Sequence, residues 1–330
     1  MQDRIESVET LWADFATPIR AAEDYINSLR GRRMNVFFMG ERVPEPVDHP
    51  VIRPSINAMA ETYQLATEQP DLATVHSGIS ERRINRFLHV PASPGELVAK
   101  HEMQRELGRR TGTCFQRCVG LDAIGSCHSV TFDIDGKHGG EYHKRFLAFL
   151  ERAQAANVVI GGAMTDPKGD RSMPPHQQRD ADLFLHVVRR DDKGIYVSGA
   201  KMHQTGAVNS HWLIFMPTMR LTEADRDWAV VGAVRVDAPG LTYIVGRQTN
   251  DTRIVDGGAL DAGNAQFAGQ ESLIVFDEVF VPHEHVFMDG EWAYASFRLT
   301  LARAEKHVCR GSSARVPWLG ICWRACKSGP

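Results

Sequence analysis

The pattern of apolar and polar positions divides the chain near residue 158. Before that point apolar residues recur every three or four positions, which is typical of amphipathic helices. The predicted helices cover 5–15, 17–29, 93–109 and 141–156. Two of them begin at Thr17–Pro18 and Ser93–Pro94, where a hydroxyl N-cap precedes a proline at the first helical position. A short apolar run at 34–39 predicts a strand, and the prolines between 44 and 54 predict an irregular connection.

After residue 158 short apolar runs replace the helical periodicity. Strands are predicted at 181–190, 193–201, 211–216, 229–236, 241–245 and 272–281. The first two are joined by Asp191–Asp192–Lys193–Gly194, which is typical of a hairpin turn. Helices followed by strands predict an α+β fold, in which a helical domain lies beside a β-barrel or sandwich, and not a parallel βαβ sheet.

Composition and charge exclude several classes of protein. The chain has 330 residues, 43% of them hydrophobic and 24% charged, which is usual for a globular protein of two or three domains. A formal net charge of −3 indicates neither nucleic acid nor an anionic membrane as a partner. No apolar run approaches the ~20 residues of a membrane span. The mixed charges of residues 1–6 do not resemble a signal peptide, so we expect a cytoplasmic protein.

The last 33 residues differ from the rest of the chain. Residues 298–330 contain seven Lys or Arg and one acidic residue, Glu305. They also contain three of the six cysteines. This change of composition fits either a basic interaction tail or a chain that departs from its own design here, through truncation or a shifted reading frame.

Cys114 and Cys118 form the first candidate site. Six cysteines in 330 residues are too few for a disulfide scaffold, so each thiol is either a small core residue or a metal ligand. On a helix, positions four apart share a face, and two thiolates so placed can hold two corners of an iron–sulfur cluster. The spacing alone leaves both interpretations open.

Three further segments carry polar groups close to predicted strands. The backbone donors of 161–171, with Lys168 and Arg171, could hold a phosphate or a flavin, or form a charged surface loop. The strand end at 201–206 suits a polar heterocycle, or is simply solvated. Glu271 begins an apolar strand and would act as a base if burial raised its pKa, although such a carboxylate more often faces water.

Several strings together resemble one family. They are DHPVIRPSIN (48–57), INRF (84–87), TGTCFQRCVG (111–120), GAMTDPKGDR (162–171), GAKMHQTG (199–206), NSHW (209–212), GRQ (246–248), DTR (251–253) and GQE (269–271). In this order they resemble the 4-hydroxyphenylacetate 3-monooxygenase family, and within it the branch of 4-hydroxybutyryl-CoA dehydratases, over about residues 20–296.

The resemblance implies an acyl-CoA-dehydrogenase-like fold. We expect an N-terminal helical domain at 1–157 and a central β-barrel at 158–290. In the family a C-terminal helical bundle follows and builds a homotetramer. In this chain we expect that bundle to be missing, with 291–330 as an atypical remnant, which puts the tetramer in doubt.

The resemblance also implies two cofactors, FAD and a 4Fe-4S cluster with three Cys ligands and one His ligand. Cys114 and Cys118 match the first two ligands, and Cys309 is carried over as a third. The expected flavin-contacting residues are Met164, Thr165, Asp166, Lys168, Gly169, Asp170, Arg171, His203, Gln204 and Thr205. The family's His-x6-Cys spacing fails, because Ala302 stands seven residues before Cys309, and the expected catalytic tyrosine has no clear counterpart.

The implied reaction is the dehydration of 4-hydroxybutyryl-CoA to crotonyl-CoA, with isomerisation of vinylacetyl-CoA. Flavin would supply one-electron chemistry and the cluster iron a Lewis acid for the departing hydroxyl. Glu271 would be the catalytic acid/base group, and Thr205 would tune the flavin. Two alternatives stay open, namely an aromatic monooxygenase that uses reduced FAD and needs no cluster, and an inactive truncated chain.

Overall fold

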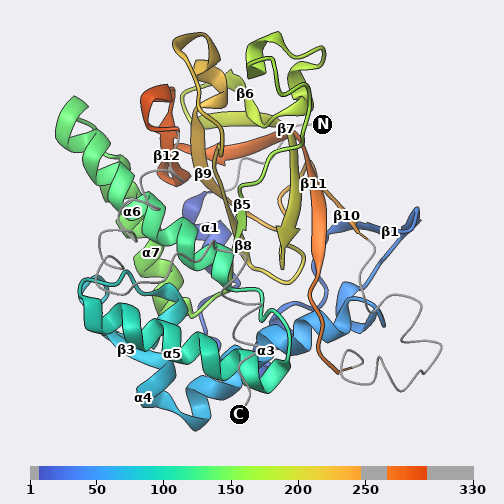
Figure 1. Cartoon of the computed structure of the whole chain (residues 1–330), viewed down its shortest axis with the longest axis vertical. Helices are drawn as coiled ribbons and strands as arrows, with labels where there is room; N and C mark the ends of the chain where they lie inside the picture. Colours follow the sequence, from blue (N-terminus) through green and yellow to red (C-terminus); the bar gives the residue numbers. More distant parts are fainter. Residues whose placement is uncertain (1–6, 247–265, 296–330) are drawn as a thin grey trace.

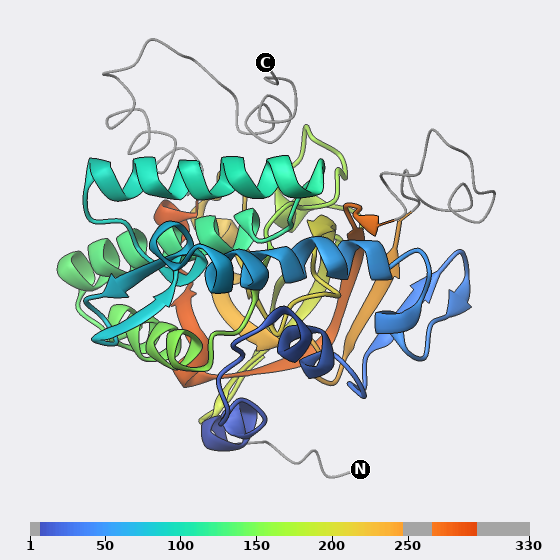
Figure 2. The same cartoon turned by 90° about the horizontal axis from the view of Figure 1, so that it is seen from below.

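The computed structural model describes residues 7–246 and 266–295, and Figure 1 shows helices at one end and strands at the other. The helices are α1 (Val8–Ala13), α2 (Ala22–Ser28), α3 (Arg53–Glu68), α4 (Pro70–Ala73), α5 (Pro94–Thr111), α6 (Cys118–His138) and α7 (Tyr142–Ala156). Figure 2 shows α3 and α5 running side by side, with the sheets on the far side of α3 from α5.

Capping residues set the ends of several helices. The Ser93 hydroxyl accepts the backbone N–H of Glu96, as predicted for the start of α5, and Gly112 ends that helix with φ +61°. The prediction for α2 is wrong at its start. This helix begins at Ala22 and not after Thr17. The Asp24 carboxylate caps it by accepting the backbone N–H groups of Arg20 and Ala21, which directly precede the helix.

Two long helices, α3 and α6, were not predicted from the sequence. In α3 the buried residues Ile56, Met59 and Tyr63 recur at helical spacing, a signal that the sequence analysis did not use. Its start contains Pro54, which the sequence analysis assigned to an irregular connection. In α6 Gly120 packs directly against β5 (Ile160–Ala163), since a Cβ there would lie 1.8 Å from the carbonyl oxygen of Ile160.

The strands form two larger sheets and one ribbon. The strands are β1 (Asn35–Phe38), β2 (Glu41–Arg42), β3 (Thr74–Ser77), β4 (Arg82–Asn85), β5, β6 (His186–Arg190), β7 (Gly194–Thr205), β8 (Trp212–Phe215), β9 (Val230–Arg235), β10 (Leu241–Val245), β11 (Glu271–Pro282) and β12 (Val286–Asp289). One sheet has the order β2-β1-β10-β11-β7-β6, the other has the order β12-β9-β8-β5, and β3 pairs with β4.

These sheets confirm the predicted β region but not its closure. The β6–β7 hairpin and the strand that starts at Glu271 are present as predicted. The two larger sheets are separate in their hydrogen bonding, and the described residues form no closed barrel. The expectation of a central β-barrel is therefore not confirmed, whereas the α+β class is.

The core joins both halves of the chain. Trp12 of α1 stacks on Trp212 of β8 with ring centroids 4.6 Å apart, and α7 packs against β12. Strand β1 pairs in parallel with β10, so hydrogen bonds cross the domain boundary expected at residue 157. That division into domains stays a prediction. Within the described ranges, no helix has the length and apolar character that crossing a membrane requires.

Candidate functional site

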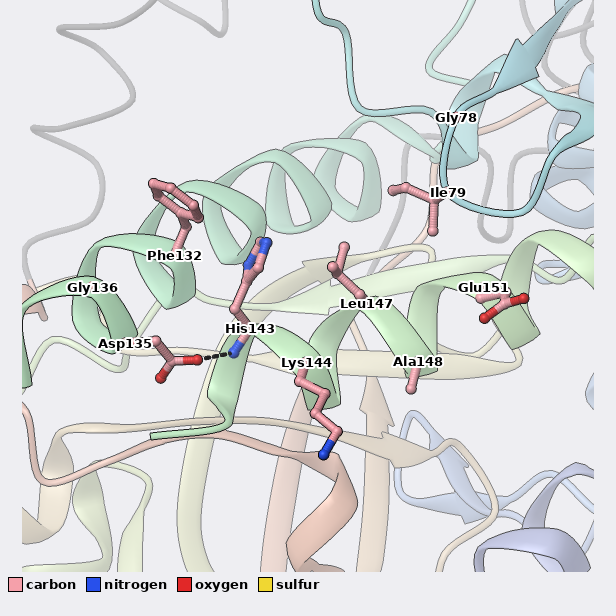
Figure 3. Close-up of a pocket in the computed structure, with 10 residues that line it drawn as sticks. All are labelled: Gly78, Ile79, Phe132, Asp135, Gly136, His143, Lys144, Leu147, Ala148 and Glu151. Carbon is pink, nitrogen blue, oxygen red and sulfur yellow. Dashed lines mark hydrogen bonds between the residues drawn. The ribbon is translucent and has the colours of Figure 1, made fainter. Parts of the chain in front are cut away.

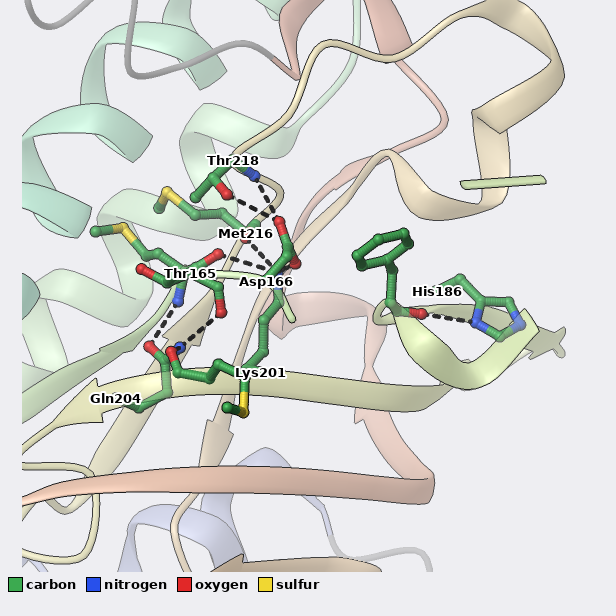
Figure 4. A network of polar contacts seen from close by, with 10 residues as sticks. Thr165, Asp166, His186, Lys201, Gln204, Met216 and Thr218 are labelled. Atoms are coloured by element: carbon green, nitrogen blue, oxygen red, sulfur yellow. Dashed lines mark hydrogen bonds and ion pairs between the residues drawn. The ribbon is translucent and has the colours of Figure 1, made fainter. Parts of the chain in front are cut away.

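Two predicted polar segments lie side by side although they are almost 40 residues apart in sequence. The loop after β5 is bound to the end of β7 through Gln204, as Figure 4 shows. The Gln204 carboxamide accepts the Met164 N–H and donates to the Thr165 carbonyl oxygen, both at 2.9 Å. The backbone N–H of Met202 donates to the same carbonyl at 2.8 Å. The loop therefore has a fixed position on the strand.

A buried ion pair holds the same loop more deeply. The Lys201 ammonium lies 2.5 Å from the Asp166 carboxylate, with side-chain exposures of 2% and 7%. Lys201 also donates to the carbonyl oxygens of Met164 and Met216, and the second oxygen of Asp166 accepts the Thr218 hydroxyl (Figure 4). Sequence analysis placed Asp166 and Gln204 among flavin-contacting residues. Here their polar atoms are occupied by protein groups, so they support the loop.

The side chains that remain available stand at the ends of β7 and β11. Thr205 and Glu271 are paired in register, and the Thr205 hydroxyl donates to the Glu271 carboxylate at 3.4 Å. His203, with φ +55°, brings Nδ1 to 3.6 Å from the other carboxylate oxygen. These three residues form the strand-end cluster. The Glu271 side chain is 49% exposed, because it stands where the strand begins.

The rest of the predicted phosphate or flavin loop is exposed. Lys168, Gly169, Asp170 and Arg171 all face solvent, and neither Lys168 nor Arg171 forms an ion pair within the described ranges. The Gln178 side chain accepts the Asp170 N–H at 3.0 Å and donates to the Asp170 carbonyl at 2.8 Å. The loop thus presents two cations from a braced backbone, which suits an anionic ligand.

The two cysteines do not share a helix face. Cys118 is the first residue of α6, whereas Cys114 lies in the loop before it, and Gln116 between them has φ +64°. This left-handed turn brings the Gln116 N–H to 3.4 Å from the Cys114 sulfur. Cys118 is 7% exposed and belongs to an apolar cluster with Phe87 and Phe115. The helix-face prediction is wrong, since α5 and α6 are separate helices.

Gln116 connects the thiol loop to the strand-end cluster, and sequence analysis did not single it out. Its side-chain amide donates to the carbonyl oxygens of Ser55 and Ala268, three residues before Glu271. Asn209, after β7, donates to the Ser55 hydroxyl at 2.8 Å. The resembling strings TGTCFQRCVG and NSHW contain Gln116 and Asn209, but only the tertiary structure connects them.

Buried polar groups next to Glu271 lack partners. Gln270 is fully buried, and both polar atoms of its side chain have no hydrogen-bond partner, as is also true of the Ser272 hydroxyl. Native proteins usually satisfy such groups, so unpaired ones mark a place that another group completes. Gln270 directly precedes Glu271, the first residue of β11, and Ser272 follows it. The resembling string GQE contains Gln270, but only the structure shows that its side chain is buried and unpaired.

A surface cavity of about 740 Å³ lies elsewhere. Figure 3 shows it between α6, α7 and the β3–β4 turn. Its lining residues are Gly78, Ile79, Phe132, Asp135, Gly136, His143, Lys144, Leu147, Ala148 and Glu151. It contains none of the predicted site residues and adds nothing to the case for a flavin site.

Within the described ranges no group of three or more His, Cys, Asp or Glu side chains could hold a metal ion. Cys309, the predicted third thiol ligand, lies outside those ranges, as do 247–248 and 251–253 of the resembling strings. The structure therefore brings two predicted ligands near each other and does not test the rest of the set.

Comparison with known proteins assigns the family. The sequence profile described as "4-hydroxyphenylacetate 3-hydroxylase N terminal" matches residues 21–288, which is most of the chain. The chain belongs to this family.

Individual relatives fall in both branches. The chain is 49% identical over 280 residues to a 4-hydroxybutyryl-CoA dehydratase/vinylacetyl-CoA-Δ-isomerase of Clostridium aminobutyricum, covering 84% of this chain and 57% of that protein. It is 58% identical to an oxygen-tolerant archaeal 4-hydroxybutyryl-CoA dehydratase structure from N. maritimus, with a TM-score of 0.84, covering 88% of this chain and 59% of that one.

The monooxygenase branch is more distant. The oxygenase component of 4-hydroxyphenylacetate 3-monooxygenase, solved with FAD, superposes with a TM-score of 0.74 at 21% identity. That match covers 93% of this chain and 61% of that structure, and it shows the fold alone. The chain thus spans somewhat more than half the length of the relatives it matches.

Proposed function

We propose that this chain forms the flavin- and thiol-bearing part of an enzyme that dehydrates 4-hydroxybutyryl-CoA and isomerises vinylacetyl-CoA. The observation that carries the proposal is Cys114 and Cys118, two thiols at the start of α6, in a chain 49% identical to a dehydratase of that name. A flavin monooxygenase acting on dioxygen has no use for such a pair. The predicted acyl-CoA substrate and the homotetramer belong to the same proposal.

FAD fits the loop after β5 and the end of β7. A bound flavin supplies one-electron chemistry to the substrate. Thr165 and Thr205 offer hydroxyls, and Lys168 and Arg171 offer unpaired positive charge for the cofactor's phosphates. Gln270, with its unpaired buried amide, is a further group that a bound ligand or water would satisfy. Gln204 keeps these groups in place by binding the loop backbone on both sides.

A 4Fe-4S cluster fits the thiol loop in part. When bound, it supplies a Lewis-acidic iron for the hydroxyl of the substrate. Cys114 and Cys118 would be two ligands, and the Gln116 N–H donates to the Cys114 sulfur as is usual around such clusters. Cys309 stays the predicted third ligand. The Gln116 side chain ties this loop to the backbone before Glu271, which would keep both cofactors in register with one substrate.

Glu271 is the proposed acid/base group. The thioester acidifies only the α-carbon of the substrate, and the Glu271 carboxylate would accept a proton from carbon and return it. Thr205 donates to one carboxylate oxygen and His203 lies near the other, so both orient it. A substrate bound over the strand-end cluster would exclude water from this exposed carboxylate.

Cofactor content tests the proposal directly. The chain is purified without oxygen, and FAD, iron and sulfide are measured for the native chain and for Cys114→Ser, Cys118→Ser and Cys127→Ser. Cys127 is the matched control, since it lies in the interior of α6 and burial raises the pKa of its thiol. We expect iron to be lost from the first two variants only. A native chain with FAD and no iron would contradict a cluster in this chain and would leave the two alternatives, the monooxygenase branch and the inactive truncated chain.

A second measurement tests Glu271. Glu271→Gln should lower the rate of crotonyl-CoA formation by about 10²–10⁴-fold, as is typical for the loss of a general acid/base, while FAD and iron contents stay unchanged. Glu278→Gln is the control, because that glutamate is exposed on the same strand. Equal rates for both variants would show that Glu271 is a solvated surface residue without a catalytic role.

A further inference from the structure

Arg117, between the two cysteines, is a buried cation whose partners are all neutral. Its side chain is fully enclosed, at 2% exposure for the residue. The guanidinium donates to the Thr62 hydroxyl at 3.0 Å and to the Val158 carbonyl at 3.4 Å. It lies between the rings of Tyr63 and Phe87, at 5.1 and 4.8 Å from their centroids. No Asp or Glu of the described ranges forms an ion pair with it.

A buried charge without a counter-charge is unusual because desolvation is not compensated. Elsewhere in the described chain some buried cations have a carboxylate partner and others do not. Arg86, at 6% exposure, donates only to the carbonyl oxygens of Asp71, Leu72 and Thr74. Lys201 has Asp166, and Arg235 lies 2.8 Å from both Asp237 and Asp14. An arginine cannot avoid this desolvation cost by losing its proton, since its guanidinium stays charged in proteins. The interior around Arg117 therefore has an excess positive charge.

The surroundings of Arg117 add to this positive potential. Arg117 directly precedes α6, a helix of 21 residues. The positive end of the helix dipole lies at its first residue, Cys118. Phe87, which covers the guanidinium, also packs with Phe115 in the apolar cluster that contains Cys118. In such low-dielectric surroundings the charge acts at full strength on its neighbours. Of the two proposed thiolate ligands, Cys118 directly follows Arg117 in the chain and Cys114 lies three residues before it.

We propose that Arg117 is the internal counter-charge of an anionic, thiolate-bound iron–sulfur cluster, and that its charge controls how firmly the cluster is held and how readily it accepts an electron. This inference rests on the proposed cluster. Thiolate ligands make such a cluster negative, and reduction by one electron makes it more negative. A fixed positive charge beside it therefore stabilises the reduced form more than the oxidised form and raises the reduction potential.

The test adds the missing carboxylate without removing Arg117. Thr62→Asp would place a negative charge at the position where the hydroxyl now accepts from the guanidinium, and Thr62→Asn is its neutral control of the same shape. Iron and FAD contents, urea midpoints and the potential from a dithionite titration are measured on anaerobic chain. We expect Thr62→Asp to lower the equilibrium constant for one-electron reduction at least tenfold against Thr62→Asn, which is about 59 mV. We also expect it to lose iron faster.

A purely structural role for Arg117 predicts the reverse pattern. Thr62→Asp would then raise the urea midpoint by completing an ion pair and would leave the potential and the iron content equal to those of Thr62→Asn, which overturns the inference while the cluster stands. Arg117→Lys and Arg117→Gln provide an independent pair. The lysine variant should keep the potential and the glutamine variant should lower it, and equal potentials would again overturn the inference. A native chain that binds FAD but no iron fails the proposed cluster itself, and the inference with it.

Discussion

Two buried cations of the described chain are held in opposite ways. Lys201 has every hydrogen-bond donor occupied and a carboxylate at 2.5 Å, and its network fixes the loop after β5. Arg117 is equally buried but has a hydroxyl, a carbonyl and two aromatic rings around it. The first arrangement is complete within the protein, whereas among the described residues the second has no negative charge. Burial alone therefore does not determine whether a charged group has a counter-charge.

The largest expected effect breaks the complete network. Asp166→Ala leaves the Lys201 ammonium buried and unpaired, which should lower the free energy of unfolding by about 3–5 kcal/mol. Urea denaturation followed by circular dichroism measures this. Thr165→Ala, one residue away and exposed, is the control and should change stability by less than about 0.5 kcal/mol. If Asp166→Ala costs no more than the control, the pair does not support the loop.

A smaller loss is expected at Gln204. Gln204→Leu leaves the Met164 N–H without a partner, at about 1–3 kcal/mol for a buried group left unsatisfied, and removes one of the two donors to the Thr165 carbonyl oxygen. The same change should weaken FAD retention, because the loop is no longer fixed. Gln177→Leu, on the exposed side of the same region, is the matched control for both measurements. Normal FAD binding by Gln204→Leu would separate the loop from the cofactor.

Removing the unpaired cation should cost less than removing the paired anion. Arg117→Met in metal-free protein loses two hydrogen bonds and the ring contacts but also removes a desolvated charge, so we expect a net change of about 1 kcal/mol. The measurement is the same urea titration as for Asp166→Ala. Arg235→Met serves for comparison, since it breaks ion pairs with Asp237 and Asp14 and should cost more. A larger loss at Arg117 than at Asp166 would contradict the contrast between the two sites.

The smallest effect on stability is expected in the strand-end cluster. Thr205→Ala removes a partly exposed hydroxyl with one long hydrogen bond to Glu271, so the free energy of unfolding should change by less than about 0.5 kcal/mol. The free energy of FAD binding should weaken by ~1 kcal/mol, the contribution of one hydrogen bond, or the reduction potential of the flavin should shift by an equivalent amount. Thr205→Ser keeps the hydroxyl and should behave as the native chain. If Thr205→Ala and Thr205→Ser bind FAD equally, Thr205 does not contact the flavin.

The elements whose signals are local could be predicted from the amino-acid sequence alone. Ser93 caps α5, Gly194 closes the β6–β7 hairpin and Glu271 begins β11, because capping, turn and strand preferences depend on neighbours within a few residues. The ordered strings also indicated the family, and the resemblance implied roles for the two thiols and for the loop after β5. Helix α3 was missed although its apolar residues recur at helical spacing, because the sequence analysis assigned Pro54 in its first turn to an irregular connection.

The arrangement of the polar and thiol groups became visible only in the folded structure. It paired Lys201 with Asp166, joined Gln116 to the backbone before Glu271, left Cys114 off the helix and kept the two larger sheets open. Each of these results depends on groups that are far apart in sequence or on the way whole elements pack. The lack of a carboxylate beside Arg117 among the described residues is of the same kind, since only the folded structure shows which groups lie next to a charge.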